Sequence, residues 1–105
     1  MKNKKKIIKK KIISILKHIY DPEINVNIYD IGLIYNIKVK KNNVIILMTF
    51  TSPNCPLSNK IIKNIKNKIK KKIKKINKVY IKITFEPPWN KNMISKKAKL
   101  ELGLI

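Results

Sequence analysis

Two prolines, Pro53 and Pro56, constrain the middle of this chain more than any other local feature. Residues 44–50 are almost wholly apolar and rich in β-branched side chains, which predicts a strand. Pro53 has no N–H to donate to a sheet, so this strand must end by Ser52. Pro56 suits the first position of a helix, where the missing N–H is no loss. The sequence therefore predicts a strand, a short turn and a helix in direct succession.

Cys55 lies inside this turn and is the only cysteine of the chain. Its expected position at or next to the helix N-cap places it near free backbone N–H groups and the positive end of the helix dipole. Such a position lowers the pKa of a thiol and favours the thiolate, which attacks electrophiles and binds iron or zinc. The alternative is a cysteine that serves as a small apolar core residue. A single cysteine excludes an internal disulfide and fits a reducing cytoplasm.

Apolar periodicity predicts the elements before that turn. Residues 4–20 repeat isoleucine and leucine at helical spacing with lysines opposite, which favours a helix packed on a core over one lying on a membrane. Asp21-Pro22 is expected to end this helix, and a loop follows through Tyr29. Residues 33–40 alternate between apolar and polar side chains and predict a strand. With the turn at residues 41–43, the two strands are expected to form a hairpin.

The second half continues with a helix over about residues 56–76, a strand over 79–85 and a short helix capped by Ser95 and stopped by Gly103. The predicted order is α-β-β-α-β-α: an α+β, two-layer domain with helices packed on a small mixed three-stranded sheet. At 105 residues without an internal repeat, the range 1–105 is expected to be a single domain. No apolar run approaches the roughly 20 residues of a membrane span, so we expect no membrane partner.

The net charge of +21 comes from 26 lysines and no arginine. Lysine, isoleucine and asparagine make up 62 of the 105 residues, and these three amino acids share A- and T-rich codons. Our hypothesis is that an AT-rich genome placed lysine and asparagine on the surface. Arginine would favour specific nucleic-acid contacts, so only nonspecific binding to RNA or DNA at low salt is expected. A small basic nucleic-acid-binding α+β protein remains the alternative function.

Four of the five acidic residues lie in turns beside proline, glycine or tryptophan. Capping and turn formation would explain each acid alone. Taken together with Cys55, they favour a shared site rim at these turns. Gly32 is included in this rim. As one of only two glycines, it is expected to need a special backbone angle or a close approach. The predicted rim comprises Asp21, Glu23, Asp30, Gly32, Thr51, Ser52, Glu86 and Trp89.

Five short motifs occur in an order that resembles a known family. They are Asp21-Pro22-Glu23-Ile24, residues 29–35 (YDIGLIY), residues 49–56 (TFTSPNCP), Glu86-Pro87-Pro88-Trp89, and residues 93–103 (MISKKAKLELG). This set resembles the SufT/PaaD-like metal–sulfur cluster assembly family over roughly residues 10–105. The resemblance implies a cytoplasmic, non-enzymatic α+β accessory factor that helps the SUF-type iron–sulfur assembly machinery deliver clusters to client apo-proteins. It also implies that Cys55 is the cluster or metal contact.

The chain departs from the family pattern at three places. Asn25 stands where members usually have proline, and Asn54 stands where glycine is frequent. Asparagine is the non-glycine residue best suited to a left-handed turn, so the second change is mild. The family's acids along the long helix are absent, which puts any partner contact made by them in doubt.

One cysteine cannot hold an iron–sulfur cluster, which normally takes four ligands. Three mechanisms remain: a homodimer that shares a cluster between two Cys55 thiolates, a transient cluster held during transfer, or an adaptor that docks clients through the Pro-Pro-Trp turn. We favour transient participation or docking. An enzymatic thiol would need a histidine base, and His18 is the only histidine.

Overall fold

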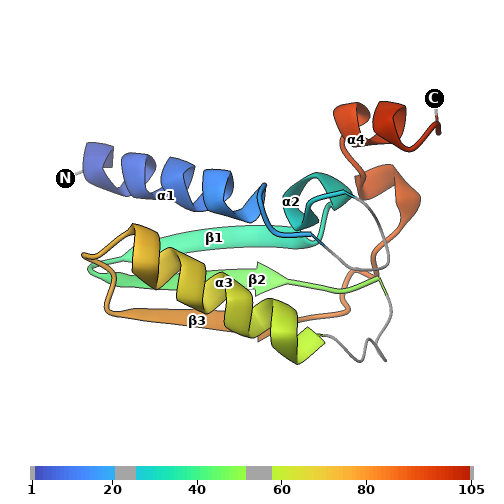
Figure 1. Cartoon of the computed structure of the whole chain (residues 1–105). Coiled ribbons are helices and arrows are strands. Elements are labelled where there is room, and N and C mark those ends of the chain that lie inside the picture. Colours follow the sequence, from blue (N-terminus) through green and yellow to red (C-terminus); the bar gives the residue numbers. More distant parts are fainter. Residues whose placement is uncertain (1, 21–25, 52–57, 105) are drawn as a thin grey trace.

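The computed structural model describes residues 2–20, 26–51 and 58–104. The expected helices and strands follow one another in the predicted order, with two short helices in addition (Figure 1). The α+β fold with the order α-β-β-α-β-α is confirmed. The elements are α1 (Lys2–Leu16), α2 (Ile28–Ile31), β1 (Ile34–Lys40), β2 (Asn43–Met48), α3 (Ser58–Lys72), β3 (Lys78–Ile83), the 3₁₀ helix η1 (Lys91–Met93) and α4 (Lys96–Glu101).

The sheet is mixed, as predicted, with the strand order β1-β2-β3. β1 and β2 form the antiparallel hairpin, and β3 runs parallel to β2 after the chain crosses over through α3. Ile34, Met48 and Ile83 lie side by side across the three strands. This register brings the start of β1 and the ends of β2 and β3 to one edge of the molecule. In the hairpin turn, Lys41 rather than an asparagine takes the left-handed angle, with φ 56°.

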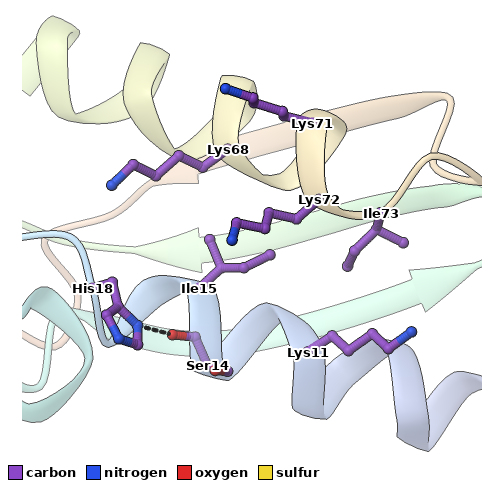
Figure 2. Close-up of a pocket in the computed structure, with 8 residues that line it drawn as sticks. All are labelled: Lys11, Ser14, Ile15, His18, Lys68, Lys71, Lys72 and Ile73. Atoms are coloured by element: carbon purple, nitrogen blue, oxygen red, sulfur yellow. Dashed lines mark hydrogen bonds between the residues drawn. The ribbon is translucent and has the colours of Figure 1, made fainter.

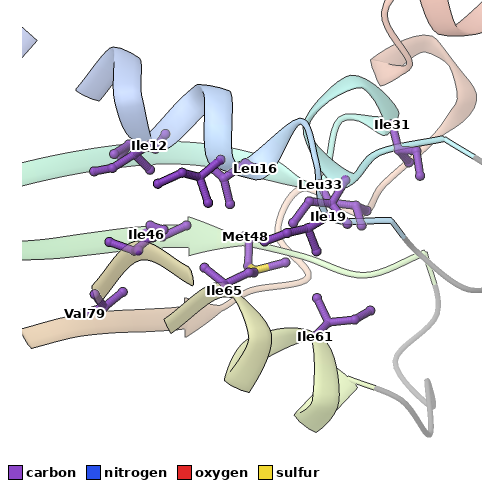
Figure 3. Close-up of a cluster of buried hydrophobic side chains, with 14 of the residues drawn as sticks. Ile12, Leu16, Ile19, Ile31, Leu33, Ile46, Met48, Ile61, Ile65 and Val79 are labelled. Atoms are coloured by element: carbon purple, nitrogen blue, oxygen red, sulfur yellow. The ribbon is translucent and has the colours of Figure 1, made fainter. Parts of the chain in front are cut away.

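The core lies between the sheet and the two long helices, which cover the same face (Figure 1). Ile12 and Leu16 of α1 and Ile65 of α3 are fully buried against Ile46 and other side chains of β2 (Figure 3). Each such side chain contributes about 1.5–3 kcal/mol relative to an exposed one. The apolar stripes that predicted the two helices are therefore the core-facing stripes.

The opposite face of the sheet is more polar. Lys38 of β1 and Lys82 of β3 are exposed there, and they flank Ile45 and Leu47 of β2, which are half-buried. This arrangement of one buried and one solvated face is typical of small sheets.

Helix α1 was predicted to continue to residue 20, but it ends at Leu16. The following backbone N–H groups of His18 and Ile19 bond three residues back, at 3.0 and 3.2 Å, and tighten the last turn. The chain then pairs with the later segment through the N–H of Ile28 and the carbonyl of Ile19, at 2.8 Å. Ile19 is buried in the core in this paired conformation. Residues 17–19 therefore follow a tighter path than an α-helix, and α1 ends at Leu16.

Helix α3 was predicted to reach residue 76, and that boundary is also wrong, because the helix ends at Lys72. The N–H of Asn77 donates to the carbonyl of Asn42 at 2.6 Å, which ties the connection to the hairpin turn. Ile73 and Ile76 are still buried, as their place in the apolar stripe predicted. The predicted helix start at residue 56 lies outside the described residues. Within the described ranges, no helix combines the length and apolarity needed to cross a bilayer.

Candidate functional site at one end of the sheet

Three segments meet at the edge where β1 begins and where β2 and β3 end. The N–H of Thr49 donates to the carbonyl of Leu33 at 2.9 Å, and the N–H of Thr84 donates to the carbonyl of Met48 at 2.9 Å. These bonds carry the strand pairing beyond the strands themselves. The chain leaves this edge after β2 toward Cys55. Cys55 itself, with Asp21, Glu23 and Ser52 of the predicted rim, lies outside the described residues.

The one-turn helix α2 replaces part of the predicted loop through Tyr29. Asn27 is its N-cap: the side-chain oxygen accepts from the N–H of Asp30 at 2.9 Å, and the side-chain amide donates to the Asp30 carboxylate at 2.8 Å. The carbonyl of Asp30 accepts from the N–H of Ser95 at 2.7 Å. Asp30 is half-buried, and its bonds are those of a capping residue that also fixes the C-terminal segment.

Gly32 closes α2 with a left-handed backbone at φ 95°. A Cβ atom at this position would lie 2.8 Å from the carbonyl carbon of Met93 and would overlap its oxygen. The prediction that Gly32 needs a special backbone angle or a close approach is therefore confirmed, because the structure shows both a positive φ and a close approach to Met93. The consequence is that α2 and η1 can pack backbone against backbone.

The turn at residues 86–89, which we call the Pro-Pro-Trp turn, is held against α2 and β1. The indole N–H of Trp89 donates to the carbonyl of Ile31 at 2.9 Å. The hydroxyl of Tyr35 donates to the carbonyl of Pro87 at 2.7 Å and lies 3.6 Å from the sulfur of Met93. The peptide bond between Glu86 and Pro87 is cis. These contacts form a brace across the site end of the sheet.

Trp89, which belongs to the turn that the docking mechanism would use, is half-buried and packs against the core. Its N–H is already used within the chain. The turn still presents a surface, because Glu86, Pro87 and Pro88 are exposed. The backbone N–H of Glu86 donates to the hydroxyl oxygen of Thr84 at 3.1 Å, which shapes the approach to the turn.

The structure thus joins three rim residues and places two more at the same edge. Asp30, Gly32 and Trp89 are connected through α2 and its partners, and Glu86 belongs to the Pro-Pro-Trp turn. Thr51 is half-buried and follows β2 by three residues. Sequence reasoning missed the supporting residues. A cap signal was present in Asn27, Asp30 and Gly32, whereas nothing local marked Tyr35 as the partner of Pro87.

The described residues contain no group of three histidine, cysteine or acidic side chains that could hold a metal ion. His18 donates from Nδ1 to the carbonyl of Ser14 at 2.8 Å, because a carbonyl can only accept. This bond caps the end of α1. A complete protein ligand set for a cluster is therefore not assembled by these parts of the chain.

The chain matches known proteins over most of its length. The family described as iron–sulfur cluster assembly protein matches residues 9–86. An "Fe-S protein maturation auxiliary factor" of Porphyromonas gingivalis is 46% identical over 95 residues, which cover 90% of each chain. The Staphylococcus aureus "Fe-S protein maturation auxiliary factor SufT" is 36% identical over 87 residues, covering 82% of this chain and 98% of that one.

A solved structure agrees with these sequence matches. A Bacillus anthracis domain of unknown function superposes with a TM-score of 0.92 and 29% sequence identity, and the match covers 100% of both chains. The resemblance to the SufT/PaaD-like family, drawn from five short motifs, is confirmed by the family match and by the sequence relatives. The chain belongs to the iron–sulfur cluster assembly protein family.

Proposed function

We propose that this protein is an accessory factor in iron–sulfur protein maturation, and that it helps pass clusters to client proteins with Cys55 as the cluster or metal contact. The observation that best supports this proposal is the 46% identity to an Fe-S protein maturation auxiliary factor across 90% of both chains. The relatives reported above are maturation factors. None of their names refers to nucleic-acid binding, so the alternative of a basic nucleic-acid-binding protein is not supported.

The number of ligands supports transfer over storage. Cys55 is the only thiol of the chain, and a cluster normally takes four ligands. A cluster contacted by Cys55 would therefore keep ligands from the donor or the client, or from a second copy of this chain. The cluster is cargo in this proposal, and the protein acts without catalysing a reaction. The setting we propose is the cytoplasm, beside SUF-type assembly machinery.

The site edge supports this role mechanically. Hydrogen bonds hold the Pro-Pro-Trp turn, α2 and the end of β2 together. We propose that they also fix where the segment that contains Cys55 begins. Exposed Pro87 and Pro88 lie in the same braced turn. A rigid, exposed turn can bind a client with little loss of conformational entropy. We propose that clients dock at this edge while the cluster passes.

The test is anaerobic transfer of a cluster from a loaded scaffold protein to a four-cysteine apo-ferredoxin, followed by visible absorption. We expect Cys55→Ser and Cys55→Ala to slow the transfer that this protein promotes by about tenfold or more, because the thiolate ligand is lost. Lys38→Gln is the control, since Lys38 is exposed on the solvated sheet face. Transfer at the wild-type rate by both Cys55 variants would refute the ligand role.

Reconstitution with iron and sulfide separates the arrangements of the cluster. A chromophore that requires Cys55, with iron equal to one cluster per two chains, would support sharing between two copies. A chromophore seen only when donor or client is present would support transient contact. If no chromophore forms and Cys55→Ser still captures the client, the result would support the adaptor mechanism and contradict a ligand role for Cys55.

A further inference from the structure

A groove runs between α1 and α3 and is lined by lysines from both helices (Figure 2). Its volume is about 620 Å³. Lys11 of α1 and His18, two residues after α1 ends, line it from one side, and Lys68 and Lys72 of α3 line it from the other. In Figure 2, Lys68 and Lys72 reach from α3 toward the side of His18 and Ile15. We call this hollow and its continuation, described next, the α1–α3 groove.

A second hollow of about 650 Å³ continues the groove toward the start of α1. It shares Lys11, Lys72 and Ile73 with the first hollow. Lys4 and Lys5 of α1 and Lys41 of the hairpin turn add further positive charges. The start of α1 and the hairpin turn lie at the opposite end of the sheet from α2 and η1 (Figure 1). This second hollow therefore lies at the opposite end of the sheet from the site edge, whereas His18, at the other end of the groove, is next to Ile19, whose carbonyl accepts from the N–H of Ile28 in α2.

The charges along this groove are of one sign. The described residues that line both hollows include lysine, histidine, serine, asparagine and isoleucine, and none of them is acidic. The lysines at the end of α3 suit the negative end of their own helix, whereas Lys4 and Lys5 lie in α1, whose first turn carries no acid. Like charges gathered in a concavity repel one another, and an anionic occupant would relieve that repulsion.

Apolar side chains identify the kind of anion. Ile7 lines the groove and is 53% exposed, and Ile8 beside it is half-buried, whereas Ile15 and Ile73, which also line it, are buried. A groove for single-stranded nucleic acid would gain from aromatic side chains on which bases stack, and the described lining residues include none. Isoleucines edged by lysines instead complement a helix with one leucine-rich and one glutamate-rich face.

We propose that the α1–α3 groove binds an acidic amphipathic segment of a partner protein. The 15 residues of α1 extend about 22 Å, so a helical segment of about 15 residues would span the groove. The occupant would lie between the two long helices, and none of the groove's lining residues belongs to the Pro-Pro-Trp turn. This binding does not depend on Cys55.

The probe is a fluorescein-labelled 16-residue synthetic helix with glutamates on one face and leucines on the other, measured by fluorescence anisotropy at constant salt. The groove variant is Lys68→Gln with Lys72→Gln. The matched control is Lys38→Gln with Lys82→Gln, which removes the same charge from the exposed sheet face. We expect the groove variant to bind about tenfold more weakly and the control to change Kd by less than about twofold.

A third variant tests the apolar part of the groove. Ile7→Ser removes an exposed side chain, so the fold is expected to persist, as circular dichroism would verify. We expect it to weaken peptide binding about threefold or more while leaving binding of a single-stranded DNA of equal length unchanged.

Three results would overturn the proposal. The first is equal loss of binding in the groove and control variants, which would show attraction to net charge alone. The second is equal affinity for a peptide with glutamine in place of glutamate. The third is tighter, groove-dependent binding of the DNA or of anionic lipid vesicles than of the peptide.

Discussion

Replacing Gly32 by alanine tests the packing of α2 against η1. The left-handed angle of φ 95° costs an alanine about 1 kcal/mol. The new Cβ would also sit 2.8 Å from the Met93 carbonyl carbon, so backbone must move to reach ordinary contact. Forced packing of this kind costs typically about 1–3 kcal/mol. We therefore expect Gly32→Ala to lower the free energy of unfolding by about 3 kcal/mol, out of a total of about 5–15 kcal/mol for a domain of this size.

Gly103 supplies the matched control. It also has a positive φ, 73°, but no atom lies within 4 Å of a Cβ built there. Gly103→Ala should therefore carry only the backbone cost, about 1 kcal/mol or less. For 105 residues, these losses correspond to falls in Tm of about 14 °C for Gly32→Ala and about 4 °C for Gly103→Ala.

Urea unfolding followed by circular dichroism measures both variants under the same conditions. The difference between them isolates the close approach of Gly32 to Met93 from the shared cost of a left-handed alanine. Equal destabilisation of the two variants would refute the packing argument, because it would show that the backbone at Met93 accommodates the new Cβ without cost.

Two smaller predictions concern the other contacts of the site edge. Trp89→Phe keeps an aromatic ring but leaves the carbonyl of Ile31 without its donor, so we expect a loss of about 1–3 kcal/mol in urea unfolding, and an unchanged midpoint would contradict the brace. Asn27→Ala removes the N-cap of α2 and should cost about 1 kcal/mol. The backbone N–H of Asp30 reports on this cap, because it donates to the side chain of Asn27. In Asn27→Ala its amide hydrogen should exchange faster with solvent, and exchange at the wild-type rate would argue against the cap.

The sequence was sufficient to predict the elements whose apolar pattern repeats along the chain. Ile61, Ile65 and Ile69 are buried on α3 in the stripe that predicted the helix. The same stripe misplaced the helix end, because Ile73 and Ile76 are buried from a turn as well as they would be from a helix. A periodic pattern records which side chains face the core, and only caps and tertiary contacts decide where the helix ends.

The structural roles of the predicted rim residues could be inferred from the sequence only in part, for a physical reason. Gly32 was identified correctly because a glycine is rare in this chain and its backbone freedom is a local property. The bond between Tyr35 and Pro87 joins residues 52 positions apart, so no local pattern predicts it. Trp89 shows the same limit. No local pattern tells whether a tryptophan after two prolines is exposed or half-buried, because this depends on its hydrogen bond to the distant carbonyl of Ile31.

Two variants can test whether the Pro-Pro-Trp turn supports the fold at this edge or binds clients there. The brace's hydrogen bonds to backbone end on the carbonyls of Ile31 and Pro87, so they fix the path of the chain, and Pro87 and Pro88 remain exposed. If the Pro-Pro-Trp turn only supports the approach to Cys55, Trp89→Phe should lower stability yet transfer clusters at the wild-type rate well below its Tm. If the turn is itself the docking surface, Pro88→Ala should slow transfer while stability stays nearly unchanged, because Pro88 is exposed. The two variants therefore assign the edge to support or to docking independently of Cys55.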